Sequence, residues 1–145
     1  MAKKGAGRYI VGIDQSTQGT KALLFDAELV RASLESIAYQ ITDIIRAMER
    51  DSKRDISLLR VDGGATGNRY LMQFQSDIAG CEVSVSETEE LSGTGAAFMA
   101  GMKRGLWDIE IFDTIKRRHV LPEMAEDVRR QKYQGYQKAV DRIRN

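Results

Sequence analysis

Apolar and polar positions alternate in distinct patterns along the chain, and each pattern predicts an element. Two apolar, β-branched runs, Tyr9–Ile13 and Lys21–Phe25, flank a polar stretch that contains Gly19, and this predicts a β-hairpin. Apolar residues then recur every three or four positions, which predicts an amphipathic helix ending near Arg50. The face that we expect to be buried consists of Val30, Leu34, Ile37, Ile41, Ile44, Ile45 and Met48.

Strands and helices alternate beyond that helix. The predicted strands are Ile56–Val61 and Cys81–Val85, and the predicted helices are Asn68–Ala79, Gly93–Arg104 and Glu123–Arg144. Gly80 is expected to end the second of the four helices. The order β-β-α-β-α-β-α-α predicts right-handed crossovers and a largely parallel sheet with one antiparallel hairpin at an edge.

Composition excludes several classes of function. The 145 residues suffice for one compact domain, and a formal net charge of +1 gives no electrostatic case for a nucleic-acid partner. No apolar run approaches the roughly 20 residues of a membrane span. The single Cys81 cannot form an internal disulfide, which is typical of a reducing cytoplasm. One His and one Cys, far apart, make a zinc site or a Cys–His nucleophile pair unexpected.

The first turn that carries chemistry follows the first strand. Asp14 stands where a carboxylate can hold hydrated Mg²⁺, and the stretch Thr17–Thr20 offers hydroxyl, amide and backbone donors to phosphate. Lys21 adds a positive charge. The alternative is an ordinary polar hairpin, and the stretch is no Walker A loop because no Gly-Lys-Ser/Thr closes it.

A second turn follows the third predicted strand. Asp62, Gly63 and Gly64 end this strand, and Asn68 opens a helix. Ligands in open α/β sheets bind at the carboxyl ends of strands, where Gly64 permits close backbone approach and Asn68 can donate a hydrogen bond. The alternative is a glycine-rich turn with Asn68 as an ordinary helix N-cap.

Other candidate residues have a simpler interpretation. Gly93 and Gly95 begin a Gly-x-Gly-x-x-Gly pattern, but Phe98 occupies the last position and excludes a dinucleotide fingerprint. We expect Cys81 to be a small buried apolar residue. The basic run Lys116–His119 is interpreted as a solvated face, although an anion site remains the alternative. Tyr133 and Tyr136 are interpreted as packing residues, and Leu106, Trp107 and Phe112 are expected to pack locally.

Several stretches resemble the FGGY family of carbohydrate kinases. Gly12–Asp26 is similar to the family's amino-terminal phosphate motif. Stretches similar to the carboxy-terminal domain are Arg31–Gln40, Arg60–Ile78, Gly95–Gly101 and Tyr136–Val140. The resemblance implies an α/β fold of the ribonuclease-H-like, actin-like ATPase class, with a mixed sheet, an N-terminal β-hairpin and flanking helices. It implies ATP and Mg²⁺ as cofactors and phosphorylation of glycerol or a small sugar such as xylulose.

The resemblance also assigns roles to individual residues. It places Asp14 beside the metal, Gly64 and Asn68 near the adenosine, and the phosphates against Thr17, Gln18, Gly19 and Lys21. The stretch Ser16–Lys21 departs from the pattern of glycerol-phosphorylating members and resembles that of pentulose kinases.

Length is the larger departure, because family members are several times longer and this chain passes from hairpin to late helix near Ala27. We expect an internally deleted kinase without its catalytic Asp or substrate pocket. Its expected parts are residues 1–29, the phosphate hairpin, and 30–145, the carboxy-terminal domain, together one compact unit. We expect Ile10–Ile13 to pair with Leu58–Val61 and complete a small sheet. A non-catalytic nucleotide-binding module and a structural fragment that self-associates through exposed apolar surface are the alternatives.

Overall fold

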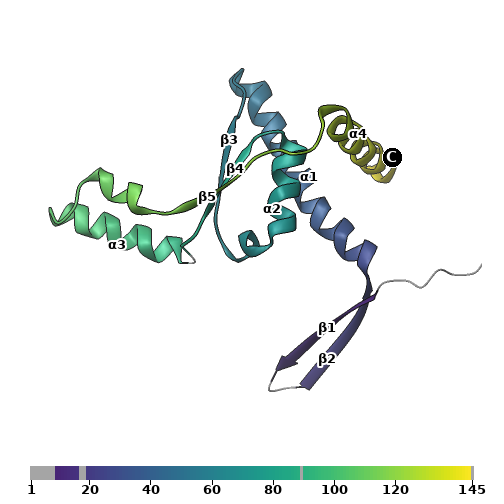
Figure 1. Ribbon diagram of the computed structural model, residues 1–145, viewed down its shortest axis with the longest axis horizontal. Helices are drawn as coiled ribbons and strands as arrows, with labels where there is room; N and C mark the ends of the chain where they lie inside the picture. Colours follow the sequence, from purple (N-terminus) through teal and green to yellow (C-terminus); the bar gives the residue numbers. More distant parts are fainter. Residues whose placement is uncertain (1–8, 17–18, 89, 145) are drawn as a thin grey trace, which may run out of the picture. The chain divides into compact units, whose positions relative to one another are not determined.

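The computed structural model describes the backbone of residues 9–16, 19–88 and 90–144 (Figure 1). Its contacts divide the chain into two compact units, Met1–Ile37 and Ala38–Asn145, which are described separately. Among the described residues, no helix is both long and apolar enough to cross a membrane.

The first unit contains the predicted β-hairpin. β1 (Tyr9–Ser16) pairs antiparallel with β2 (Gly19–Asp26), in a register that runs from Tyr9 opposite Asp26 to Ser16 opposite Gly19. α1 (Ala27–Ser52) starts directly after β2, and the Asp26 carboxylate accepts a hydrogen bond from the Glu28 N–H at 2.8 Å. An acceptor before the first turn satisfies a backbone donor that has no partner within the helix, which explains why strand passes into helix without a linker.

The second unit contains a mixed sheet of three strands. β3 (Leu58–Val61) is parallel to β4 (Glu82–Ser86), and β4 is antiparallel to β5 (Arg117–Val120). The predicted pairing of Ile10–Ile13 with Leu58–Val61 is wrong, because the hairpin forms a two-stranded sheet of its own. The α/β class with a mixed sheet and flanking helices is confirmed, but the antiparallel strand of this sheet is β5.

α2 (Arg69–Ala79) connects β3 to β4 and supplies much of the core (Figure 1). Its predicted end is confirmed, since Gly80 adopts the left-handed conformation at φ 69°. Leu71, Phe74 and Ile78 of this helix are all buried, and they pack on Val83 and other apolar side chains of the sheet. The core of this unit therefore lies between the sheet and α2.

The buried face of α1 differs from the predicted one. Its buried residues are Ala38, Thr42 and Ile45, while the side chains of Ile44 and Met48 are 61% and 55% exposed. Thr42 tolerates burial because its hydroxyl donates to the Ala38 carbonyl oxygen at 2.8 Å. Ala38 and Thr42 have small side chains, and the hydroxyl of Thr42 is hydrogen-bonded within the helix, so this face can pack closely. Part of the predicted apolar stripe is left on the surface.

Two more helices complete the second unit. α3 (Leu91–Lys103) packs against the 3₁₀ helix η2 (Ile109–Thr114). α4 (Glu126–Arg144) packs against α2, and Figure 1 shows it after β5 near the C-terminus. The hydroxyls of Tyr133 and Tyr136 in α4 donate to the two carboxylate oxygens of Asp43 at 2.5 and 2.8 Å. The interpretation of these tyrosines as packing residues is confirmed.

Candidate functional site

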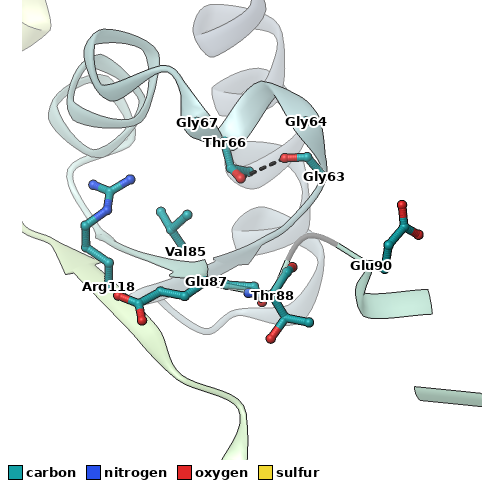
Figure 2. Close-up of a pocket in the computed structure, with 10 residues that line it drawn as sticks. Gly63, Gly64, Thr66, Gly67, Val85, Glu87, Thr88, Glu90 and Arg118 are labelled. Atoms are coloured by element: carbon teal, nitrogen blue, oxygen red, sulfur yellow. Dashed lines mark hydrogen bonds between the residues drawn. The ribbon is translucent and has the colours of Figure 1, made fainter. Parts of the chain in front are cut away.

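A hollow of about 560 Å³ lies at the carboxyl ends of the two parallel strands. Figure 2 shows it between the turn that follows β3, the segment that follows β4, and Arg118 of β5. Its lining consists of Gly63, Gly64, Thr66, Gly67, Val85, Ser86, Glu87, Thr88, Glu90 and Arg118. This is the position at which open α/β sheets bind ligands, because the ends of parallel strands and the following turns enclose a crevice there.

Glycine at position 63 determines the shape of the first wall. Gly63 has φ 90° and ψ 171°, a conformation that side-chain-bearing residues rarely adopt. Its carbonyl oxygen accepts two hydrogen bonds from Thr66, one from the N–H at 3.0 Å and one from the hydroxyl at 2.7 Å (Figure 2). These bonds close the 3₁₀ turn Gly64–Gly67, so the wall is held by its backbone and the small side chain of Thr66.

Gly64 and Gly67 leave their part of the hollow open. A Cβ atom added to either residue would meet no atom within 4 Å. The absence of side chains here is therefore not required by packing inside the protein. It exposes main-chain surface that a flat or bulky ligand can approach closely.

The opposite wall is formed by the segment that follows β4. The Ser86 hydroxyl oxygen accepts from the Thr88 N–H at 3.1 Å, which turns the chain at the end of the strand. The Glu87 N–H donates to the Lys116 carbonyl oxygen at 3.0 Å and ties this turn to the segment before β5. Glu90 precedes α3 and lines the same hollow, at the right in Figure 2, across from Arg118.

Among the described residues, the ionic side chains of the lining are two carboxylates, Glu87 and Glu90, and one guanidinium, Arg118. Carboxylates accept hydrogen bonds from hydroxyl and amino groups, and they repel phosphate. The hollow therefore suits a ligand part that is rich in hydroxyls or amines better than a polyphosphate, while Arg118 offers one cation at the rim.

The structure places the sequence-predicted site residues in two separate groups. Gly64 lines the hollow, as the carboxyl-end rule predicts. Asn68 lies four residues further on and is the N-cap of α2, with its Oδ1 accepting from the Leu71 N–H at 3.1 Å. The capping interpretation of Asn68 is confirmed; a role in ligand contact stays a prediction. Its side-chain amide nitrogen is not used in this cap.

The remaining predicted residues belong to the hairpin. Asp14 and Lys21 are register partners across it, and Gly19 is the partner of Ser16. Thr17 and Gln18 lie outside the described residues. The phosphate and metal roles of these five residues stay predictions.

Most of the lining was not predicted from the sequence. Glu87 and Thr88 follow β4 directly, so the rule that selected Gly64 after β3 would also have selected them after β4. Arg118 was missed because its basic run was interpreted as a solvated face, whereas the structure makes it strand β5. The register opposite Val85 explains its position, since it points Arg118 to the same side of the sheet.

Other candidate groups are accounted for by local contacts. Among the described residues, no group of three or more His, Cys, Asp or Glu side chains could hold a metal ion. The Nδ1 atom of His119 pairs with the carboxylate of Glu82 on the neighbouring strand β4. Cys81 is buried as expected, and burial raises the pKa of its thiol. A raised pKa lowers the thiolate fraction at neutral pH, so this thiol is a poor nucleophile.

Known proteins place the chain in a family. Residues 1–104 match the family model described as the C-terminal domain of the FGGY family of carbohydrate kinases. The chain belongs to this family. It is 49% identical over 122 residues to the glycerol kinase of Petrotoga mobilis and 48% identical over 120 residues to that of Natranaerobius thermophilus. These alignments cover 82% and 80% of this chain, but the chain spans only about a quarter of the relatives' length, 24% in each case.

A solved structure supports the same placement. The chain is similar to the crystal structure of Plasmodium falciparum glycerol kinase with ADP, with a TM-score of 0.71 and 30% sequence identity. The match covers 84% of this chain and 26% of that one. The fold of the chain is therefore that of part of a glycerol kinase, and the actin-like ATPase class expected from the sequence agrees with it.

Proposed function

We propose that the chain forms the nucleoside-binding part of an ATP-dependent carbohydrate kinase, and that it binds the adenosine end of ATP or ADP in the hollow beside Gly64. The observation that carries this proposal is the glycine-lined hollow at the carboxyl ends of β3 and β4. The match to a glycerol kinase crystallised with ADP supports nucleotide as the ligand class.

The chemistry of the lining supports binding of the nucleoside end, and not of the phosphates, in this hollow. A base is flat and can lie on the open main-chain surface of Gly64 and Gly67, where no side chain intervenes. The carboxylates of Glu87 and Glu90 accept hydrogen bonds from ribose hydroxyls or an exocyclic amine. The same carboxylates disfavour a triphosphate inside the hollow, so the phosphates extend outward from it.

The phosphate end of the proposal rests on the hairpin. Thr17, Gln18, Gly19 and Lys21 would contact phosphate oxygens, and Asp14 would hold Mg²⁺ through water. Magnesium would neutralise the charge that spreads over the phosphoryl oxygens during transfer. The acceptor in the family is glycerol or a small sugar, and the glycerol kinase relatives favour glycerol over a pentulose such as xylulose for the parent enzyme.

We expect no phosphoryl transfer by this chain alone, because it spans 24% of its relatives' length. Loss of a general base typically costs about 10²–10⁴ in rate, and loss of acceptor contacts costs more. A coupled assay of ADP release with glycerol and with xylulose tests this expectation. Turnover that depends on either acceptor would overturn it and leave the binding proposal intact.

Nucleotide binding is tested by titrating the ¹⁵N-labelled chain with ATP and Mg²⁺. We expect the amide signals of Gly64 and Gly67 to shift. Gly64→Val should abolish these shifts because its side chain enters the hollow without meeting the protein's own atoms within 4 Å at Cβ. Gly135→Ala in α4, which also has open space at Cβ, is the matched control and should bind like the unaltered chain. Equal shifts in all three proteins, or none in the unaltered chain, would contradict the proposal.

A further inference from the structure

Arg118 stands in a row of the sheet that is otherwise apolar. The register of the three strands places Val61 opposite Val85, and Val85 opposite Arg118. Val85 is 4% exposed, and Val120, two residues beyond Arg118 and therefore on the same face of β5, is 7% exposed. Both of these valines belong to the core between the sheet and α2. Arg118 thus takes the last place in a core-facing row, at the edge where the hollow begins.

The guanidinium group of Arg118 has no ionic partner in the part of the chain that the structure describes. Its side chain is half-buried, yet the four ion pairs between described residues do not involve it. Glu87 and Glu90, which line the same hollow, are exposed and form no ion pair with it. A half-buried cation is stabilised by an anion that replaces its lost water. An anionic group of a ligand would supply that partner here.

The other cations of the basic run face elsewhere. Arg117 is the register partner of Ser86, so the alternation of side chains along β5 puts it on the opposite face from Arg118. His119 shares that opposite face and pairs with Glu82. Of the residues of β5, which the structure describes in full, only Arg118 lines the hollow. The run therefore does not form one cationic patch, and Arg118 acts by itself.

We propose that Arg118 binds the phosphate nearest to the ribose, so that the hollow selects nucleotides over nucleosides. The inference rests on the proposed binding of the nucleoside end beside Gly64. A guanidinium group can donate two parallel hydrogen bonds to the oxygens of one phosphate. Figure 2 shows the Arg118 side chain beside Val85, on the same side of the sheet as the turn that carries Gly67. The base would lie on the main chain of this turn, with its first phosphate at Arg118.

The charges of the lining also determine the direction in which a nucleotide lies. Figure 2 shows Glu90 across the hollow from Arg118. A phosphate between them is attracted to the guanidinium group and repelled by the carboxylate, whereas hydroxyls and amines donate to the carboxylate. The phosphate is therefore held at β5, and the hydroxyl-bearing or amine-bearing part of the ligand lies toward Glu90.

Titration of the ¹⁵N-labelled chain with adenosine and with AMP, without Mg²⁺ and at low ionic strength, tests the role of Arg118. We expect AMP to bind at least about fivefold more tightly than adenosine, and added salt to reduce this ratio. Arg118→Gln should bind AMP no more tightly than adenosine, with its affinity for adenosine unchanged. Arg118→Lys retains the charge but not the paired donors, so its preference for AMP should be intermediate.

Arg117→Gln is the matched control, because it removes the same charge from the next residue on the opposite face. It should bind both ligands like the unaltered chain, and circular dichroism checks that all variants fold. A direct readout is the side-chain Nε–H signal of Arg118, assigned by its loss in Arg118→Lys. This signal should shift far more with AMP than with adenosine or with inorganic phosphate at the same concentration.

The possible failures are distinguishable. If adenosine and AMP bind the unaltered chain equally well, the inference is wrong and the nucleoside proposal stands. Equal loss of the AMP preference in Arg117→Gln and Arg118→Gln would show a general effect of net charge and would also contradict the inference. A shift of the Arg118 signal with inorganic phosphate as large as with AMP would indicate a site for free phosphate instead. If neither adenosine nor AMP shifts the amide signals of Gly64 and Gly67, both proposals are wrong.

Discussion

The indole ring of Trp107 lies directly against the backbone of Gly101. A Cβ atom built on Gly101 would come within 2.2 Å of Cε3 and 2.3 Å of Cζ3 of this ring, far inside van der Waals contact. Gly101 is also the only buried residue of α3. The absence of a side chain at this position thus allows the segment that leads into η2 to pack closely against α3.

We expect Gly101→Ala to displace Trp107, because the clash falls on a rigid ring that packs against Phe98. Overpacking of this kind typically costs about 1–3 kcal/mol, which exceeds the helix-propensity gain of about 1 kcal/mol from replacing glycine. Trp107 is the single tryptophan, so its fluorescence should shift to longer wavelength. Gly93→Ala, where Cβ meets nothing within 4 Å, is the control and should leave the emission unchanged.

Asn68 allows capping to be separated from ligand contact. Asn68→Asp retains a side-chain oxygen that can accept from the Leu71 N–H and removes the amide donor. If the amide contacts the nucleoside, this variant should melt at nearly the unaltered temperature but bind ATP more weakly. Asn68→Ala should lose about 1 kcal/mol of unfolding free energy through the missing cap. Unchanged ATP affinity in Asn68→Asp would show that Asn68 serves only as the cap.

Local sequence signals predicted most of the elements of the second unit because each signal acts within one or two turns. The cap at Asn68 and the left-handed Gly80 determine the ends of α2 wherever the helix packs. β5 escaped prediction because Arg117–Val120 has one apolar residue among four, and pairing with β4 rather than propensity makes it a strand. Tertiary pairing of this kind leaves no periodic signal in a basic run.

The buried face of α1 shows a different limit. The hydrophobic pattern predicted burial of Ile44 and Met48, which are exposed. The buried residues include Ala38 and Thr42 instead, whose small side chains permit close approach. Periodicity identifies an amphipathic helix but not which of two neighbouring stripes meets the sheet. For the candidate site, glycines after β3 were predictable from the carboxyl-end rule, whereas Arg118 depended on a strand that was not predicted.

Asp77 of α2 attaches the segment that leads into α4. One of its carboxylate oxygens accepts from the Glu123 N–H at 2.6 Å, the Met124 N–H at 3.1 Å and the Gln73 amide at 3.2 Å. Asp77→Ala should lower the unfolding free energy by about 2–3 kcal/mol, because charge-assisted bonds to buried acceptors are stronger than neutral ones. Urea denaturation measures this loss, and amide exchange should accelerate first in α4. Asp77→Asn, which retains one acceptor, should lose less; an equal loss would contradict the assignment.

Tyr133 predicts how stability changes in alkali. Burial, together with the hydrogen bond to Asp43, raises the pKa of Tyr133 from 10.0 to about 12. Below pH 10 both the folded and the unfolded chain hold the phenolic proton, so this contribution to stability is fully present. Between pH 10 and about 12 the unfolded chain loses the proton first, so the unfolding free energy should fall by up to about 2–3 kcal/mol.

The comparison with Tyr133→Phe isolates this effect from other alkaline changes. The variant should be less stable at neutral pH and should show a smaller fall above pH 10, because Tyr136, whose pKa is also raised by burial and by its hydrogen bond to Asp43, still contributes. Urea denaturation at several pH values measures the difference. Tyr70→Phe alters a tyrosine that is 43% exposed, and it should retain the fall. A fall of the same size in all three proteins would show that other groups, such as lysines, cause it.

Gln75 is a buried polar residue whose partners are incomplete. Its side chain is 1% exposed; among the described residues Oε1 has no hydrogen-bond partner, and Nε2 lies 3.4 Å from both the Ala38 carbonyl oxygen and the Thr42 hydroxyl. Thr42 already donates to Ala38 without help from Gln75. Gln75→Met retains the length of the side chain and removes the unpaired acceptor, so we expect the unfolding free energy to rise by about 0.5–1.5 kcal/mol. Gln75→Glu, which buries a charge, should lower it by more than that. Denaturant unfolding of the two variants checks both signs, and destabilisation by Gln75→Met would mean that the weak donor bonds outweigh the unpaired oxygen.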